Sequence, residues 1–213
     1  MSLLRGNFMT VRMLLGALLL AVPAVVSSEA EAAHADGATV PDASLLANCE
    51  GKRSIVVHKA ARTLELYCGD KLAARFESSL GFAPSGAKER EGDGKTPEGE
   101  YYVTHKFPSQ FHRSLQVSYP NIADADRGLA DGLITRAQYA AIVQANHACA
   151  APPQNTPLGS LIQIHGGGGG RDAGDWTLGC VAVDNHEIEQ VFAFQRTGCD
   201  EHGVPHTKVL LRP

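Results

Sequence analysis

The chain has 213 residues with a formal net charge of −4, and 20% of its residues are charged. It contains no basic stripe or arginine-rich run, so we do not expect a nucleic-acid partner. A mildly acidic protein of this kind can act on a polymer through a groove, but not through bulk charge.

Residues 1–35 have the layout of a secretory signal peptide and its cleavage region. Arg5 and Arg12 precede a mostly apolar stretch, Met13 to Val26, and small residues with Ala-x-Ala patterns follow. An uncleaved anchor is the alternative, but about 14 apolar residues is short for a bilayer span of roughly 20. We therefore expect export to the periplasm or cell wall, no stable membrane span, and a single domain in the rest of the chain.

Strand-like segments follow a short arm. Residues 36–48 are rich in alanine, and we expect them to form a poorly ordered arm ahead of a domain over residues 49–213. Four segments of this domain have strand character, at residues 54–58, 63–68, 71–80 and 101–104. Consecutive short strands at this spacing favour antiparallel pairing.

Between about residues 107 and 159 the pattern changes from strand to loop and helix, which predicts an insertion. Thr135 and Gln138 form a capping box, with Ile134 and Tyr139 placed as a hydrophobic staple, ahead of a helix that runs to about Ala148. The insertion precedes the next strand directly. It is therefore either a wall or lid over a site, or a plain surface excursion.

The last third of the chain returns to strands. Residues 161–165 and the segment after Cys180 have strand character, a helix is predicted after Asp184, and residues 208–211 form a final strand. Ile188, Val191 and Phe192 share one face of that helix. The fold class is thus mainly β, a sandwich of two packed sheets with one or two helices and a helical insertion.

The chain has five cysteines, so within one molecule at least one remains unpaired. Cys49 and Cys68 flank the first strands, and Cys149 and Cys199 lie in more distant, less regular segments. Two bridges among these four are plausible and leave Cys180 free. Other pairings stay open, and a bridged Cys180 is the structural alternative.

Cys180 is the candidate nucleophile. It follows Gly179 and precedes a β-branched run, a pattern that places its side chain at a tight turn leading into a strand. His165 ends an apolar run, and Gly166 and the glycines after it let the backbone turn freely. The fold can therefore bring His165 next to Cys180 as a Cys/His pair.

The chemistry of such a pair assigns a role to each group. A nearby His165 imidazolium would lower the pKa of the Cys180 thiol, and the imidazole would then act as acid and base. The backbone N–H groups of Gly179 and Cys180 are placed to stabilise a tetrahedral oxyanion, where losing one donor typically costs about 3 kcal/mol.

These motifs resemble the catalytic domain of the L,D-transpeptidase family, the YkuD-like enzymes of bacterial cell walls. The resemblance rests on His165-Gly166 with Thr177-Leu178-Gly179-Cys180-Val181, and on three further segments: Ser79 to Phe82, Asp93 to Tyr101, and Ser118 to Asn121. Asp175-Trp176-Thr177 matches the branch with Asp-Trp-Thr-x-Gly-Cys. The resemblance implies a YkuD-like β-sandwich of mixed sheets and no cofactor.

The resemblance also implies a reaction and its partners. The carbonyl of Gly166 orients His165, and the substrate is a peptidoglycan stem peptide that forms a thioester and expels D-alanine. The acceptor is another stem amine, a lysine of an outer-membrane protein such as a lipoprotein, or water in a hydrolase. Leu178 and Ala182 stand where many members have histidine and arginine, so a noncatalytic wall-binding protein is a further alternative.

Four residues are candidates for substrate binding. Thr177 and Trp176 precede the nucleophile, and Trp176 is either a substrate platform or a core residue. Tyr119 and His112 are candidates to line an acyl-donor groove, or they simply cap the insertion. Cys199 and the histidines after it are spaced more like loop residues than metal ligands, so we expect no metal site.

Overall fold

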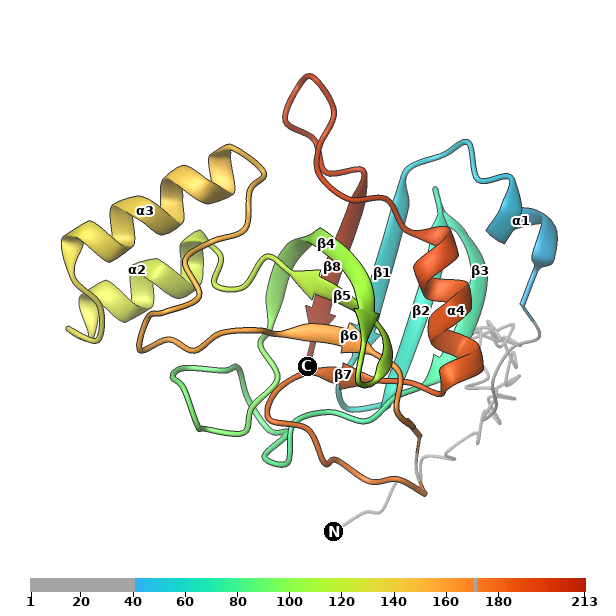
Figure 1. Cartoon of the computed structure of the whole chain (residues 1–213), viewed down its shortest axis with the longest axis horizontal. Helices are drawn as coiled ribbons and strands as arrows, with labels where there is room; N and C mark the ends of the chain where they lie inside the picture. The colour runs from blue at the N-terminus through green and yellow to red at the C-terminus, as the bar shows by residue number, and fades with distance from the viewer. Residues whose placement is uncertain (1–40, 171) are drawn as a thin grey trace, which may run out of the picture. The chain divides into compact units, whose positions relative to one another are not determined.

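The computed structural model describes residues 41–170 and 172–213 (Figure 1). The predicted signal peptide and the first part of the arm lie outside these residues. The elements in chain order are α1 (Ala43–Ala47), β1 (Arg53–His58), β2 (Thr63–Cys68), β3 (Lys71–Glu77), β4 (Gly99–Ser109), β5 (His112–Val117), α2 (Ile122–Ala130), α3 (Arg136–His147), β6 (Gln163–His165), β7 (Val181–Ala182), α4 (Asn185–Phe194) and β8 (Thr207–Arg212). Across the described ranges, every helix is too short or too polar to cross a membrane.

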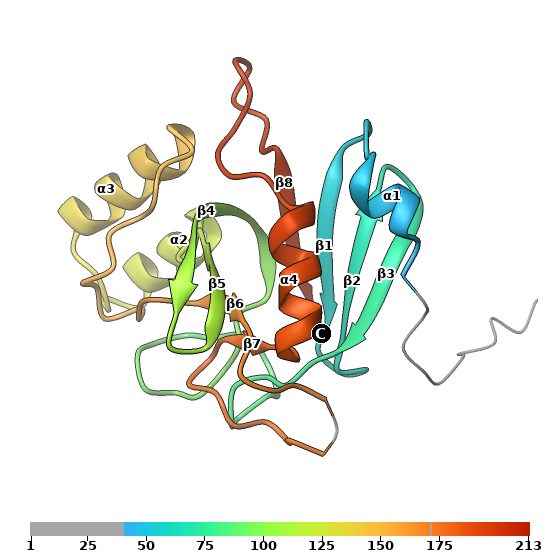
Figure 2. The same cartoon turned by 45° about the vertical axis from the view of Figure 1, so that its right-hand side comes forward.

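The strands form one curled mixed sheet in the order β3-β2-β1-β8-β4-β5-β6-β7 (Figures 1 and 2). The pairs β1–β8 and β6–β7 are parallel, and the other neighbours are antiparallel. The chain is mainly β, as predicted, but the two separate sheets of a sandwich are not observed.

Strand β4 explains the single sheet. Its first residues, Gly99 to Tyr102, pair with β8, and its later residues, from Val103 to Ser109, pair with β5. The register shifts between Val103 and His105, and such a bulge bends a strand. One strand of 11 residues therefore belongs to both halves and joins them.

Helix α4 supplies much of the core on one side of the sheet. Its capping box joins Asp184 and Glu187, as the sequence predicts. Ile188, Val191 and Phe194 are buried, whereas Phe192 is only partly so. The buried face belongs to the same hydrophobic cluster as the central residues of β1, β2 and β8, and the helix also contacts β5 and α1.

The predicted insertion begins as sheet and not as helix. β4 continues to Ser109 and β5 lies wholly inside the range 107–159, so the first part is a β-hairpin. The sequence of β5 is largely polar and hides its strand character. The helix predicted after Thr135 is confirmed, with its capping box, as α3, and α2 packs against it, apart from α4 (Figures 1 and 2).

The region before β1 is partly ordered. Asp42 caps α1, and the N–H of Asp42 donates to the carbonyl of Ala73 in β3. Two disulfides, Cys49–Cys68 and Cys149–Cys199, join the four cysteines that the sequence analysis considers for bridges. All five cysteines lie in the described residues, and Cys180 is the one left free.

Candidate active site

Cys180 and His165 come from neighbouring parallel strands. His165 ends β6 opposite Ala182, and Cys180 directly precedes β7. In a parallel pair the residues that face each other share one side of the sheet, so this register places Cys180 and His165 on the same side. With strands 4.8 Å apart and two residues of offset, their Cα atoms are ~8 Å apart, a separation that two side chains can span.

The thiol of Cys180 is half-buried and points toward the backbone of a neighbouring segment. Its Sγ lies 3.5 Å from the carbonyl oxygen of Leu161. Burial raises the pKa of Cys180, while a hydrogen bond from the backbone of Gln163 and the charge of Lys88 oppose that rise. The expectation of a thiol whose pKa is lowered by an imidazolium is therefore not met in this structure, because desolvation outweighs the favourable contacts.

The ring of His165 is buried and fixed. Its Nδ1 lies 2.6 Å from the carbonyl oxygen of Gly166, and because a carbonyl can only accept, Nδ1 carries the proton and Nε2 is the basic nitrogen. Burial lowers the pKa of His165, and the bond to Gly166 partly offsets this. A Cβ on residue 166 would lie 2.7 Å from the carbonyl oxygen of Phe111, so this position requires glycine.

Two aromatic rings enclose the imidazole. Phe111, at the turn between β4 and β5, stacks on His165 with 4.4 Å between ring centroids. Trp176 meets it edge-on at 5.6 Å, and the indole N–H donates to the carbonyl of Gly168. Phe111 was not predicted as a site residue, because only the unpredicted hairpin brings it here. Trp176 is 39% exposed, so it both packs the histidine and faces solvent.

Thr177 builds the turn that presents the cysteine. Its hydroxyl donates to the carbonyl of Cys180 at 2.8 Å and accepts from the N–H of Gly179 at 3.1 Å. The predicted oxyanion donor on Gly179 is thus already engaged. Thr177 is buried, so it holds the turn and does not line an open substrate surface. A Cβ on Gly179 would lie 2.7 Å from the carbonyl oxygen of Lys95, which explains the glycine.

A salt bridge fixes the segment before this turn. The carboxylate of Asp175 accepts from the N–H of Leu80 at 2.9 Å and from the Arg62 guanidinium at 2.8 Å. Arg62 lies between β1 and β2. The Asp-Trp-Thr motif therefore contributes an anchor, an aromatic wall and a turn in three consecutive residues.

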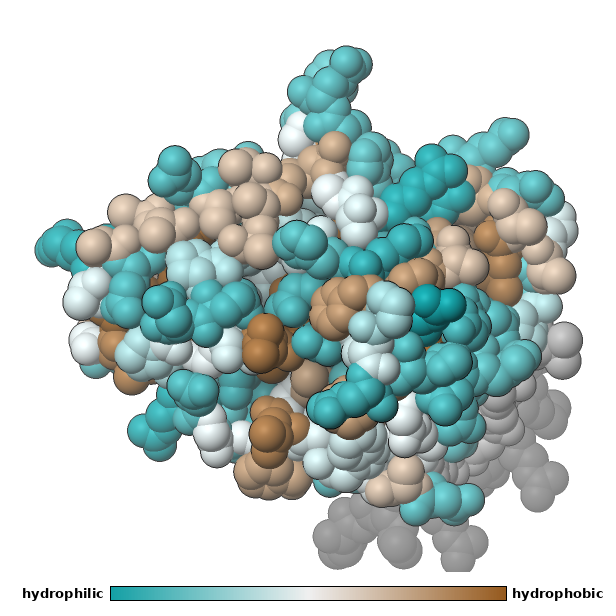
Figure 3. All heavy atoms as spheres, in the orientation of Figure 1, coloured by the Kyte–Doolittle hydropathy of each residue, from teal (hydrophilic) through white to brown (hydrophobic). Residues whose placement is uncertain are grey.

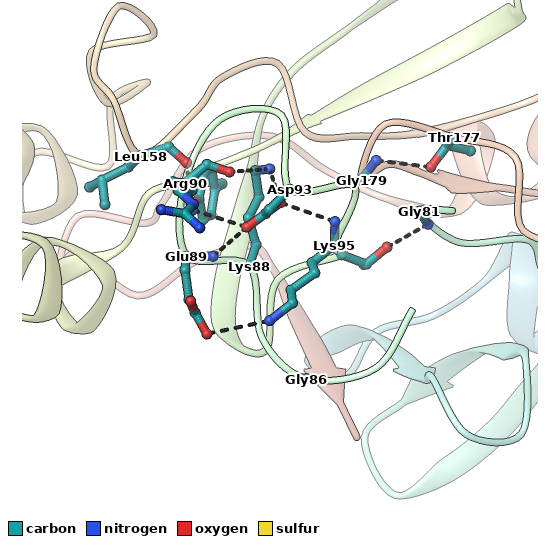
Figure 4. Close-up of polar contacts among 12 residues, drawn as sticks. Gly81, Gly86, Lys88, Glu89, Arg90, Asp93, Lys95, Leu158, Thr177 and Gly179 are labelled. Atoms are coloured by element: carbon teal, nitrogen blue, oxygen red, sulfur yellow. Dashed lines mark hydrogen bonds and ion pairs between the residues drawn. The ribbon is translucent and has the colours of Figure 1, made fainter. Parts of the chain in front are cut away.

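The loop from Gly81 to Glu98 lies beside Thr177 and Gly179, in the turn before Cys180 (Figure 4). Asp93 accepts from the backbone N–H groups of Glu89, Arg90 and Lys95 and from Nζ of Lys88. The loop is joined to the turn before Cys180, because the N–H of Phe82 donates to the carbonyl of Thr177.

Two predicted substrate residues lie elsewhere. Tyr119 is fully buried, donates its hydroxyl to the carbonyl of Leu158 at 2.7 Å, and has a pKa raised by burial. It is a core residue and the groove prediction was wrong. His112 is exposed, and its ring contacts Glu189 of α4 at 2.8 Å, so it ties the hairpin to the helix.

Exposed apolar side chains occur on the segments next to Cys180. Among the described residues, four of the five exposed large hydrophobics belong to the segments that flank Cys180: Phe82, Leu161, Trp176 and Leu178. Figure 3 shows hydrophobic atoms exposed over the loops beneath β6 and β7. No cluster of three or more metal-ligating side chains occurs in residues 41–170 and 172–213.

Comparison with known proteins identifies the family of this domain. Residues 52–209 match the YkuD family, the L,D-transpeptidase catalytic domain. The protein named "Putative L,D-transpeptidase YafK", of Escherichia coli K12, is 26% identical over 168 residues, which are 75% of this chain and 53% of that protein. The chain thus spans about half the length of the curated relatives that it matches.

Solved structures show more distant likenesses. The helical cell shape determining protein Pgp2 of Campylobacter jejuni is 21% identical with a TM-score of 0.48, covering 77% of this chain and 48% of that one. The L,D-transpeptidase of Xylanimonas cellulosilytica is 16% identical with a TM-score of 0.42, covering 76% and 60%. Because the family match covers most of the domain and includes both His165 and Cys180, the chain belongs to the L,D-transpeptidase catalytic domain family, whose members modify peptidoglycan.

Proposed function

We propose that this chain is a cysteine acyltransferase that acts on peptidoglycan stem peptides through a thioester. The observation that carries the proposal is the placement of a free thiol on the same side of the sheet as a buried imidazole. Family membership supports the choice of substrate. The predicted signal peptide and the two disulfides support action in an oxidising compartment outside the cytoplasm.

The proposed reaction begins from a neutral pair. Burial raises the pKa of Cys180 and lowers that of His165, which favours thiol and imidazole at neutral pH over a resting ion pair. Nε2 of His165 then takes the thiol proton as Sγ attacks the carbonyl carbon of the stem amide at the diamino acid. This sequence avoids a buried thiolate in the free enzyme.

The intermediate collapses with loss of D-alanine. The N–H of Cys180 is the proposed oxyanion donor, because the N–H of Gly179 is bound to Thr177. The C–N bond breaks, the imidazolium protonates the departing amine of D-alanine, and the acyl group remains on Sγ as a thioester. An acceptor amine then attacks the thioester, transfers its proton to His165 and releases the thiol.

The first test is the covalent intermediate. The protein is mixed with tetrapeptide muropeptides, and intact-mass spectrometry is used to look for an adduct that corresponds to the stem peptide minus D-alanine. The Cys180→Ala variant is the control. If wild-type protein forms no adduct and leaves the muropeptides unchanged, a noncatalytic wall-binding role replaces this proposal.

A second measurement identifies the acceptor. The reaction is repeated in heavy-oxygen water, since hydrolysis of the thioester places the label in the new carboxyl group whereas transfer to an amine does not. Labelled product without crosslinked or amine-linked product would make the protein a hydrolase of the same bonds. Candidate amines are a second stem peptide and a lysine of an outer-membrane protein.

A further inference from the structure

Lys88 is a buried cation next to the active site. Its side chain is 3% exposed, and Nζ lies 2.7 Å from Oδ1 of Asp93 and 3.0 Å from the carbonyl oxygen of Arg90. Figure 4 shows the residues around it in the Gly81 to Glu98 loop. Because the ammonium does not reach solvent, it cannot bind a substrate group directly, and any influence on chemistry must act through another residue.

The stem of Lys88 packs behind the segment that contacts the thiol. A Cβ on Gly159 would lie 2.9 Å from Cε of Lys88, and the N–H of Glu91 donates to the carbonyl of Pro157. Two residues after Gly159, the carbonyl of Leu161 receives the thiol of Cys180. Lys88 therefore sits on one side of residues 157–161 and the thiol contacts the end of the same segment.

The carboxylate that pairs with Lys88 is shared among several donors. Asp93 also accepts from three backbone N–H groups, those of Glu89, Arg90 and Lys95. These donors stabilise the carboxylate, and with Lys88 they lower the pKa of Asp93 despite its burial. In a poorly hydrated region a charge that is only partly compensated acts over several ångströms.

We propose that Lys88 is a positioning residue that stabilises the thiolate of Cys180 through the Gly159–Leu161 segment, with Asp93 setting the strength of its field. Its catalytic meaning rests on the function proposed above. The direction agrees with the charge of Lys88, which lowers the pKa of Cys180 against the effect of burial.

Other charged groups near Cys180 do not take this role. His165 faces the thiol from β6 and is held neutral by burial. The negative charge of Asp175, on the loop before Cys180, is balanced by its ion pair with Arg62. Nζ of Lys95 forms an ion pair with Glu89, whose side chain is exposed to solvent, so this pair lies in water and not in the buried region. Lys88 is therefore the buried cation whose removal should change thiolate formation.

The test measures the rate of alkylation of Cys180 by iodoacetamide as a function of pH on the full chain. Cys180 is the free cysteine, so the reaction reports one site. For Lys88→Met we expect alkylation on the order of tenfold slower at pH 7, because loss of a buried cation removes a favourable interaction with the thiolate. The two curves should converge at high pH, where every thiol is ionised. Lys88→Arg keeps the charge and should stay near wild type.

Two further variants separate charge from structural damage. Asp93→Asn removes the opposing carboxylate, so alkylation at pH 7 should become faster, the opposite of Lys88→Met. Lys59→Met is the matched control, because Lys59 is equally buried and also holds this loop, through Gly86 and Glu98. It should leave the midpoint of the pH curve unchanged.

Four results would overturn the proposal. A Lys88→Met curve that coincides with wild type, or that lies below it by one factor at every pH, would show that the charge does not act. Changes of the same sign in Lys88→Met and Asp93→Asn, or in Lys59→Met, would indicate loop damage. If Lys88→Met does not fold, Asp93→Asn alone decides: faster alkylation at pH 7 supports the proposal, and unchanged or slower alkylation overturns it. Alkylation needs no muropeptide, so failure of the proposed reaction would be seen separately.

Discussion

Replacing Thr177 by valine should loosen the turn before Cys180 and displace the candidate nucleophile. Valine has nearly the same shape but cannot donate to the carbonyl of Cys180 or accept from the N–H of Gly179. Two polar backbone groups then lose partners in a buried turn, at about 1–3 kcal/mol each. We expect the free energy of unfolding to fall by about 2–6 kcal/mol in total. A nucleophile displaced by about 1 Å should acylate on the order of 100-fold more slowly.

Urea unfolding monitored by circular dichroism gives the stability, and the rate of adduct formation with tetrapeptide muropeptides gives the reactivity. Thr177→Ser retains the hydroxyl and should remain within several-fold of wild type. The reasoning fails if Thr177→Val acylates as fast as wild type or faster. That outcome would mean that the released N–H of Gly179 serves as the oxyanion donor and that Thr177 normally restrains it.

Three other substitutions test further parts of the structure. Phe111→Ala should let water reach His165 and raise its pKa toward the ordinary value, seen by NMR titration as a midpoint moved to higher pH; an unchanged midpoint would refute a desolvating role for Phe111. Tyr119→Phe should lower the free energy of unfolding by about 1 kcal/mol without changing KM. A changed KM would instead support the prediction that Tyr119 lines the substrate groove. The double change Cys149→Ser with Cys199→Ser removes a disulfide between residues 50 positions apart and should lower the free energy of unfolding in urea by about 4 kcal/mol. Loss of the other disulfide, between residues 19 positions apart, should lower it by less.

The candidate nucleophile and base could be proposed from the sequence because their signals are local. Cys180 follows a glycine at a turn, His165 ends a short strand, and the odd cysteine count left one thiol over. Capping boxes identified α3 and α4 for the same reason, since their partners lie three residues apart. The disulfide pairs could be proposed, but several connectivities were open until the fold placed the sulfurs together.

The surroundings of those residues could not be found in this way. Nothing in the polar segment after Phe111 indicated a strand, so the contact of Phe111 with His165 was missed. Tyr119 appeared in a family-like segment and was assigned to a groove, whereas its hydroxyl is bonded inside the core. A short polar strand next to an irregular loop has too weak a periodicity to reveal which neighbour will bury it.

The amino-acid sequence alone therefore determined the mainly β class, the candidate nucleophile and base, and the helix starts, because periodicity, capping and turn chemistry act over a few residues. Tertiary structure alone decided that β4 joins both halves of one sheet, that Thr177 occupies the N–H of Gly179, and that Lys88 lies buried against Gly159. These facts depend on which distant segments pack together and on how much water they exclude. Burial then sets the pKa of Cys180 and of His165, and no local pattern encodes burial.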